Sequence, residues 1–179
     1  MSIDYTIVPC KGGNRKAYKG FKFCPKDWEA VSHYLMNKAW GRDLPCDIIQ
    51  EIDFYSYNPD QLPIRDFILG KEGEAYFFTY NRRNRSTSRG YWEEISGDVE
   101  IVYNNEVIGY KKTLAFYWGT PRNAIQSDYV MKEYRLNPCF SVADSSIKNN
   151  IENLVLCKVQ VRQETGYGYS DEDDEEQME

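Results

Sequence analysis

The chain has 179 residues, of which 41% are hydrophobic and 15% aromatic, so we expect a single domain with a filled core. Its formal charge is −6, but seven of the 28 acidic residues lie between Asp171 and Glu179, and the other 21 face 22 basic residues. A body so close to neutral excludes a uniformly basic nucleic-acid-binding protein, so any such role must depend on local patches.

Other functional classes lack their usual signals. No apolar run approaches the length of a membrane span, and the first twenty residues have no apolar signal segment. No C-x-x-C pair occurs, and the single histidine, His33, has no close partners for zinc or for a nucleophile. We therefore expect no metal, no cofactor and no enzymatic activity. We also expect reduced thiols that pack as small buried side chains at Cys10, Cys24, Cys46, Cys139 and Cys157.

The first half of the chain predicts an arm followed by helices. Residues 1–16 are polar and basic, and we expect them to form a flexible N-terminal arm before a domain at 17–162. From Asp27, taken as the N-cap, apolar residues at helical spacing predict a helix that ends near Gly41. Proline in the first turn predicts a second short helix from Pro45 to Glu51, and Asn-Pro and Leu-Pro pairs then predict turns.

The second half reads as strands. Short runs rich in β-branched and aromatic residues alternate with polar or glycine-containing turns. Helices followed by strands predict an α+β domain around an antiparallel sheet, and residues 163–179 form an acidic tail that we expect to be disordered. The predicted strands are 75–80, 90–95, 99–103, 108–119, 127–136 and 153–161.

A basic loop stands next to a pair of acids in the middle of the chain. The run "NRRNRSTSR" contains four arginines, and the carboxylates of Glu93 and Glu94 follow it within "GYWEEISGDVEI". Such a loop is either a solvated turn or a contact surface for polyanions, and we favour the second. The neighbouring aromatics, such as Tyr91 and Trp118, are better explained by core packing than by base stacking.

The blocks "GFKFCPKDWEAVSHYL", "DIIQEIDFYSYNPDQLP", "EAYFFTYNRRNR", "IGYKKTLAFYWG" and "DYVMKEYRL" together resemble the NAC domain, named for NAM, ATAF and CUC. This is a family of plant-specific transcription factors, and the resemblance covers roughly residues 17–162 in the family's order of blocks. It implies a strongly twisted antiparallel β-sheet packed between a few helices. It also implies dimerisation through the N-terminal block and binding of double-stranded DNA by the sheet.

The resemblance implies a dimer interface near the first helix. Lys22 stands where the family usually has an arginine that pairs across the dimer with the glutamate matched by Glu29, and lysine cannot form the same bidentate contact. A surface charge pair with little effect remains the alternative. The family's Leu-Pro-Pro-Gly also reads Ala-Tyr-Lys-Gly here. The residues implied at the interface are Ala17, Lys19, Gly20, Lys22 and Glu29.

The resemblance also implies a DNA-binding edge, with changes. The family's Trp-Lys-Ala-Thr-Gly reads Trp92-Glu93-Glu94-Ile-Ser here, and lysines that usually follow "FYWG" are replaced by Thr120 and Asn123. The acids could block DNA, could alter sequence preference by accepting from cytosine, or could be a solvated strand face. The positions implied in DNA binding are Arg82, Arg83, Arg85, Arg89, Trp92, Glu93, Glu94, Lys111, Lys112 and Arg122.

The sequence therefore predicts a nuclear, DNA-binding transcription regulator of the NAC type, which acts as a homodimer or heterodimer. We expect a repressor or modulator, with no membrane association. The alternative is an interaction protein that keeps the fold, has impaired DNA binding and heterodimerises with competent relatives. The acidic tail is either a solvated end or a segment that competes with DNA for the arginine loop.

Overall fold

The computed structural model describes residues 5–8, 13–18 and 20–162. Within these residues the strands are β1 (Tyr5–Val8), β2 (Arg15–Tyr18), β3 (Gln50–Glu51), β4 (Glu74–Tyr80), β5 (Gly90–Glu94), β6 (Val99–Tyr103), β7 (Glu106–Trp118), β8 (Ile125–Leu136) and β9 (Leu154–Val161). The helical segments are α1 (Asp27–Glu29), η1 (Ala30–Leu35), α2 (Met36–Ala39), η2 (Phe54–Ser56), η3 (Pro59–Gln61), η4 (Ile64–Asp66) and α3 (Ser145–Asn153).

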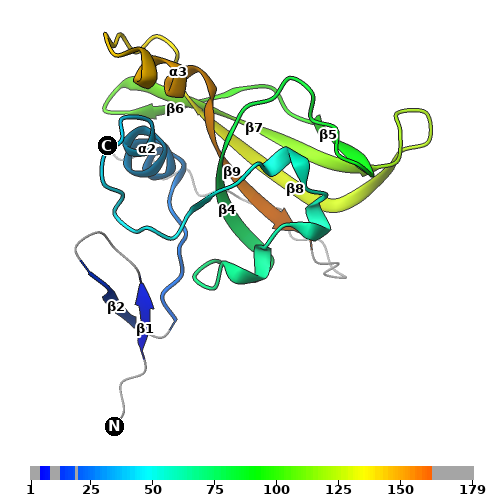
Figure 1. The fold of residues 1–179 in the computed structure, drawn as a ribbon, viewed down its shortest axis with the longest axis horizontal. Coiled ribbons are helices and arrows are strands. Elements are labelled where there is room, and N and C mark those ends of the chain that lie inside the picture. Colours follow the sequence, from blue (N-terminus) through cyan, green and yellow to red (C-terminus); the bar gives the residue numbers. More distant parts are fainter. Residues whose placement is uncertain (1–4, 9–12, 19, 163–179) are drawn as a thin grey trace.

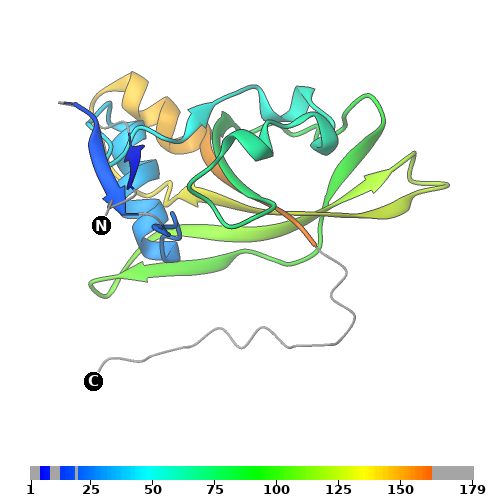
Figure 2. The ribbon, with the colours of Figure 1, turned by 90° about the horizontal axis from the view of Figure 1, so that it is seen from below.

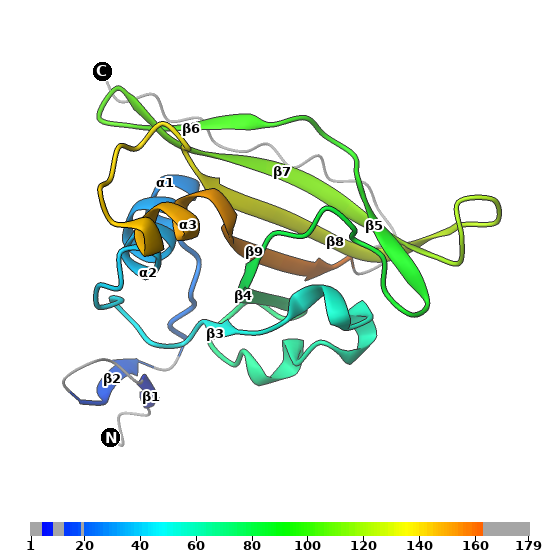
Figure 3. The same cartoon turned by 45° about the horizontal axis from the view of Figure 1, so that its top comes forward.

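One seven-stranded, twisted sheet organises the domain (Figure 1). Its order is β3-β4-β9-β8-β7-β5, with β6 also paired to β7, and every pair is antiparallel except the short β3–β4 pair. Because β7 is 13 residues long, its outer side holds both β6 and β5, which follow one another along it (Figure 3). These elements confirm the predicted α+β class.

Alternating side chains give the sheet a core on each face. On β4, Tyr76 and Phe78 pack in the first core, against the helices, whereas Ala75 and Phe77 pack in the second. The second core is closed by the segment that carries η2 to η4. Beyond the helices, the long strands β7 and β8 continue toward the far end of the molecule (Figure 2). The two-sided burial explains why these strands are so rich in aromatic residues.

The first predicted helix is confirmed, with a different start and an unusual centre. Asp27 is not the N-cap as predicted but the first helical residue, because the Glu29 carboxylate accepts from the Lys26 N–H at 2.8 Å and fixes the start one residue earlier. Six residues from Ala30 to Leu35 have π-helical bonding between the α-helical turns. This wider segment buries Val31 and Leu35 completely in the first core.

The structure differs from the prediction at two further helices. The helix predicted from Pro45 to Glu51 is wrong: the segment is extended, Ile49 is buried in the first core, and β3 pairs with β4. Helix α3 was not predicted, although the Asp144 carboxylate caps it by accepting from the N–H groups of Ser146 and Ile147.

The N-terminal hairpin was also not predicted. Strands β1 and β2 pair in antiparallel fashion, and Val8 is buried in the first core. The proposed boundary between residues 16 and 17 therefore falls inside β2. Among the helices of the described residues, none has the length and apolar character needed to cross a membrane.

Candidate nucleic-acid interface

The arginine loop, residues 81–89, is folded against β5. Ser86 forms a bridge with Tyr91, and the Trp92 N–H donates to the Arg85 carbonyl at 3.0 Å. The buried Asn58 side chain holds the loop from the other side, because its Oδ1 accepts from the Thr87 hydroxyl at 2.6 Å. A turn fixed by buried hydrogen bonds gives each arginine a defined direction.

Arg85 points into the protein. Its guanidinium donates to Glu133 Oε1 at 2.9 Å, and the two side chains are only 17% and 1% exposed. Burial alone would lower the pKa of Arg85, but the Glu133 carboxylate beside it outweighs burial, so the pKa is raised. The guanidinium is therefore paired with Glu133 inside the protein and is not available to a ligand.

Glu133 is the centre of a buried polar cluster on β8. The Tyr55 hydroxyl donates to Glu133 Oε2, and burial with this contact raises the pKa of Tyr55 far above its usual range. The Lys112 ammonium lies 3.8 Å from Glu133 and 3.3 Å from the Glu94 carboxylate. Because Lys112 is also largely buried, this predicted DNA-binding lysine connects β5 to β8 within the monomer.

Arg82 and Arg89 are paired too, but at the surface. Arg82 donates to Asp53 at 2.8 Å, and Arg89 donates to Asp60 while its guanidinium lies 4.8 Å from the centre of the Trp118 ring. Both arginine side chains remain 51% exposed. Exposed pairs of this kind contribute about 0–1 kcal/mol, so a phosphate can replace the carboxylate.

Two predicted DNA-binding cations have no carboxylate partner within the part of the chain that the structure describes. Arg83 is exposed in the arginine loop, and Arg122 is exposed in the turn between β7 and β8. This turn projects at the far end of the sheet, beyond β5 (Figure 1). These two guanidinium groups are open to solvent.

The adjacent glutamates on β5 face opposite sides of the sheet. Glu94 lies on the side of Trp92 and contacts Lys112, whereas Glu93 lies on the side of Tyr91 and has no cationic partner among the described residues. Of these two glutamates, only Glu93 therefore presents an unneutralised carboxylate. Trp92 itself is 4% exposed and packs against Phe54 and Phe116, so its predicted contact with DNA is corrected to a core position.

Lys111 faces the helices. Its ammonium contacts the Asp27 carboxylate, which also accepts from the Tyr134 hydroxyl at 2.7 Å. Burial would raise the pKa of Asp27, but the Lys111 and Tyr134 contacts together outweigh it and hold the pKa below its usual value. The consecutive lysines of β7 thus form ion pairs on opposite faces of the sheet.

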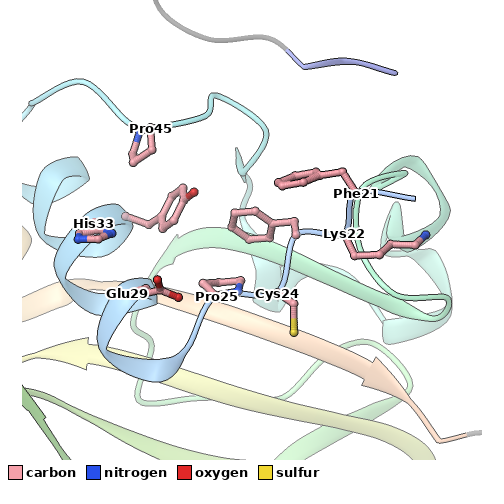
Figure 4. Close-up of a pocket in the computed structure, with 9 residues that line it drawn as sticks. Phe21, Lys22, Cys24, Pro25, Glu29, His33 and Pro45 are labelled. Atoms are coloured by element: carbon pink, nitrogen blue, oxygen red, sulfur yellow. The ribbon is translucent and has the colours of Figure 1, made fainter. Parts of the chain in front are cut away.

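The predicted dimer residues lie around the start of the first helix. Phe21, Lys22 and Glu29 line a cavity of about 290 Å³ together with Cys24 and His33, and Lys22 and Glu29 lie on opposite sides of it (Figure 4). Within one chain these charges do not pair. Ala17 belongs to β2, Gly20 has a left-handed φ of 98°, and Lys19 lies outside the described residues.

The cysteines differ from the expectation of uniform burial. Cys157 is buried, and burial raises the pKa of its thiol well above the usual value, but Cys24 and Cys139 are exposed. Cys46 is half-buried, and Cys10 lies outside the described residues. Both exposed cysteines stand beside proline in irregular segments. Within the described ranges no group of His, Cys, Asp or Glu side chains could hold a metal ion.

A twisted sheet with an arginine loop against its edge strand defines this chain as a sheet-based α+β domain. The family model described as No apical meristem (NAM) protein matches residues 18–136. The chain therefore belongs to the NAM, or NAC domain, family.

Similar relatives agree with this family. NAC domain-containing protein 2 of Oryza sativa subsp. japonica is 36% identical over 150 residues, which cover 78% of this chain and 47% of the relative. NAC domain-containing protein 41 of Arabidopsis thaliana is 40% identical over 148 residues, covering 78% and 52%. NAC domain-containing protein 96 of Arabidopsis thaliana is 35% identical over 154 residues, covering 81% and 52%. The matched region thus spans about half the length of these relatives.

Proposed function

We propose that this chain is a nuclear transcription regulator, and not an enzyme, that acts as a NAC-type dimer and contacts duplex DNA weakly. Membership of the NAC family and the position of the arginine loop against β5 support this proposal. A repressor or modulator role fits a domain with few available cations. The observation that carries the proposal is that four guanidinium groups remain exposed on the arginine loop and the β7–β8 turn, those of Arg82, Arg83, Arg89 and Arg122.

The expected affinity follows from these four groups. Each phosphate contact contributes a slope of about −0.9 to the dependence of log K on log salt, so four contacts give about −3.6 per protomer. Arg85, Lys111 and Lys112 do not add to this slope because their side chains are attached to Glu133, Asp27 and Glu94. The domain should bind DNA at low salt and lose most of that affinity at physiological salt.

The test is fluorescence anisotropy with a pool of random-sequence duplexes across a salt series. Replacement of Arg83 and Arg122 by alanine should reduce the magnitude of the slope by about two, whereas a matched Lys71→Ala, Lys148→Ala variant should leave it unchanged. No binding by the unmodified domain at low salt, or equal losses in both variants, would contradict the proposed surface.

The dimer is tested separately. Glu29→Lys places a like charge opposite Lys22 of the second protomer and should weaken association, and Lys22→Glu in the same chain should restore part of it. Sedimentation of the four proteins gives the coupling between the two reversals. A monomeric unmodified protein at micromolar concentration, or additive effects, would exclude a Lys22–Glu29 contact between protomers.

A second candidate function is favoured by the acids on the sheet edge. In this alternative the protein has lost DNA reading and works by heterodimerisation with competent relatives, because the unpaired Glu93 repels phosphate. Glu93→Lys should then raise DNA affinity, whereas Glu94→Gln should not, since Glu94 is already neutralised by Lys112. If Glu93→Lys binds DNA no better than the unmodified chain, the carboxylate does not block the edge.

A further inference from the structure

The outer side of β6 is an open sheet edge. Residues Val99–Tyr103 pair with β7 on one side, and no strand among the described residues lies on the other (Figure 3). In an antiparallel pair, alternate residues of the edge strand direct their N–H and C=O groups outward. Such a row of unpaired backbone groups can accept a further strand.

The side chains of this edge favour pairing with an apolar, extended segment. Val99 and Val102 are 49% and 53% exposed and point to opposite faces of the sheet. Ile95, directly after β5, is also exposed. A strand added here would therefore cover aliphatic surface on both faces while it satisfied the backbone groups.

The charge of the edge determines what kind of strand fits. From residue 90 to residue 110 the chain has five carboxylates and neither lysine nor arginine. Glu94 and Asp98 are paired with Lys112 and Arg135. The remaining three, Glu93, Glu100 and Glu106, are exposed and have no cationic partner in the part of the chain that the structure describes.

This charge argues against two other occupants. A second copy of the same edge would place like charges opposite one another, which destabilises strand pairing. Duplex DNA would place phosphates against three unpaired carboxylates. An extended segment with lysine or arginine between its apolar residues would instead meet opposite charges across the strand pair.

We propose that the β6 edge, defined as residues Val99–Tyr103 with the flanking carboxylates Glu93, Glu100 and Glu106, binds an extended basic segment of a partner protein as an added antiparallel or parallel strand. The segment carries β-branched residues alternating with lysine or arginine. The exposed arginines lie on the arginine loop and the β7–β8 turn and not along β6. Apart from Glu93 on β5, this interaction therefore uses different residues from the proposed DNA contact.

The experiment uses the full chain and a labelled synthetic peptide that alternates threonine with lysine. Anisotropy should show binding, and hydrogen exchange should show slower exchange of the outward-facing amides within Val99–Tyr103. Joint replacement of Glu93, Glu100 and Glu106 by lysine should weaken binding about tenfold or more. The matched control replaces Asp47, Glu72 and Glu152, three exposed acids elsewhere, and should change affinity less than about twofold.

The peptide backbone and the fold are controlled as well. A glycine–lysine peptide of the same length should bind at least about tenfold more weakly, because glycine is a poor strand former. Glu100→Gln keeps the size of the side chain and should weaken binding in an intact fold checked by circular dichroism. Equal weakening in the control triple variant, or equal affinity for both peptides, would overturn the proposal. So would protection of the same amides by duplex DNA or by raised protein concentration alone.

Discussion

Arg85 and Arg89 lie four residues apart in one loop, yet they occupy opposite environments. Arg85 is largely buried against Glu133, which also accepts from the Tyr55 hydroxyl, whereas Arg89 is half-exposed against Asp60 and the Trp118 ring. The sequence of the loop does not distinguish them. The fold does, because β8 places the carboxylate of Glu133 directly behind the loop.

The difference shows that the number of arginines in a loop does not measure its capacity for polyanions. A buried pair contributes to the free energy of folding, because loss of its cation leaves a buried carboxylate without a partner. An exposed pair is exchangeable at a cost of about 0–1 kcal/mol. The first of the following variants tests whether burial separates the two arginines, and the others test how closely the neighbouring elements are held.

The largest effect is expected from Arg85→Leu. It leaves the buried Glu133 with the Tyr55 hydroxyl and with the more distant Lys112 as its remaining cation, and should cost about 3–5 kcal/mol of unfolding free energy, whereas Arg89→Leu should cost about 1 kcal/mol or less. Urea denaturation measures both. Joint replacement of Arg85 and Glu133 by leucine should recover part of the loss. Equal losses for the two single variants would show that burial does not separate them.

A smaller effect is expected where the loop enters β5. A Cβ added at Gly90 would lie 2.1 Å from the Tyr117 carbonyl oxygen and 2.7 Å from the Phe116 ring, but one at Gly97 would meet nothing within 4 Å. Gly90→Ala should therefore destabilise by about 1–3 kcal/mol through overpacking. Gly97→Ala, as the control, should remain within about 0.5 kcal/mol. Thermal or urea unfolding of both variants decides whether β5 is held as closely as the structure shows.

The smallest effect concerns Asp27, a paired carboxylate that is partly open to solvent. Its pKa is lowered in the folded state, so its contribution is present above the ordinary carboxyl pKa and is lost as pH falls through the folded value. Asp27→Asn should cost about 1 kcal/mol at neutral pH, and the difference from the unmodified chain should shrink in acid. Unfolding at a series of pH values measures this. A constant difference down to strongly acidic pH would show that Asp27 does not titrate as described.

Much of the fold was predictable because local patterns and burial agree. The strands β4 to β9 were found within about two residues, since β-branched and aromatic residues fill both cores. The helix predicted at Pro45 failed because tertiary contacts override a weak start signal, and Ile49 is needed in the first core. Helix α3 had a readable signal, an Asp144 cap followed by Ile147 and Ile151 at a spacing of four.

The candidate site was less predictable. The sequence identifies the charged side chains, but their partners are distant in sequence: Arg85 and Glu133 are separated by 48 positions, and Lys111 and Asp27 by 84. Periodicity reports which face a side chain occupies and not which ion lies opposite it. Whether a cation is available to a ligand therefore depended on topology that the sequence pattern does not contain.

The paired lysines of β7 have a consequence for how the sheet aligns. If β7 slipped by one position, Lys111 and Lys112 would exchange faces, and each layer would still meet an ammonium group. The electrostatic energy therefore hardly distinguishes the slipped pairing from the correct one. Packing at Gly109 does distinguish them: a Cβ there would lie 2.4 Å from the Arg135 carbonyl oxygen, so only the residue without a side chain fits. Correct alignment of the β7–β8 hairpin thus depends on the smallest residue in it, and this glycine determines which lysine lies on which face of the sheet.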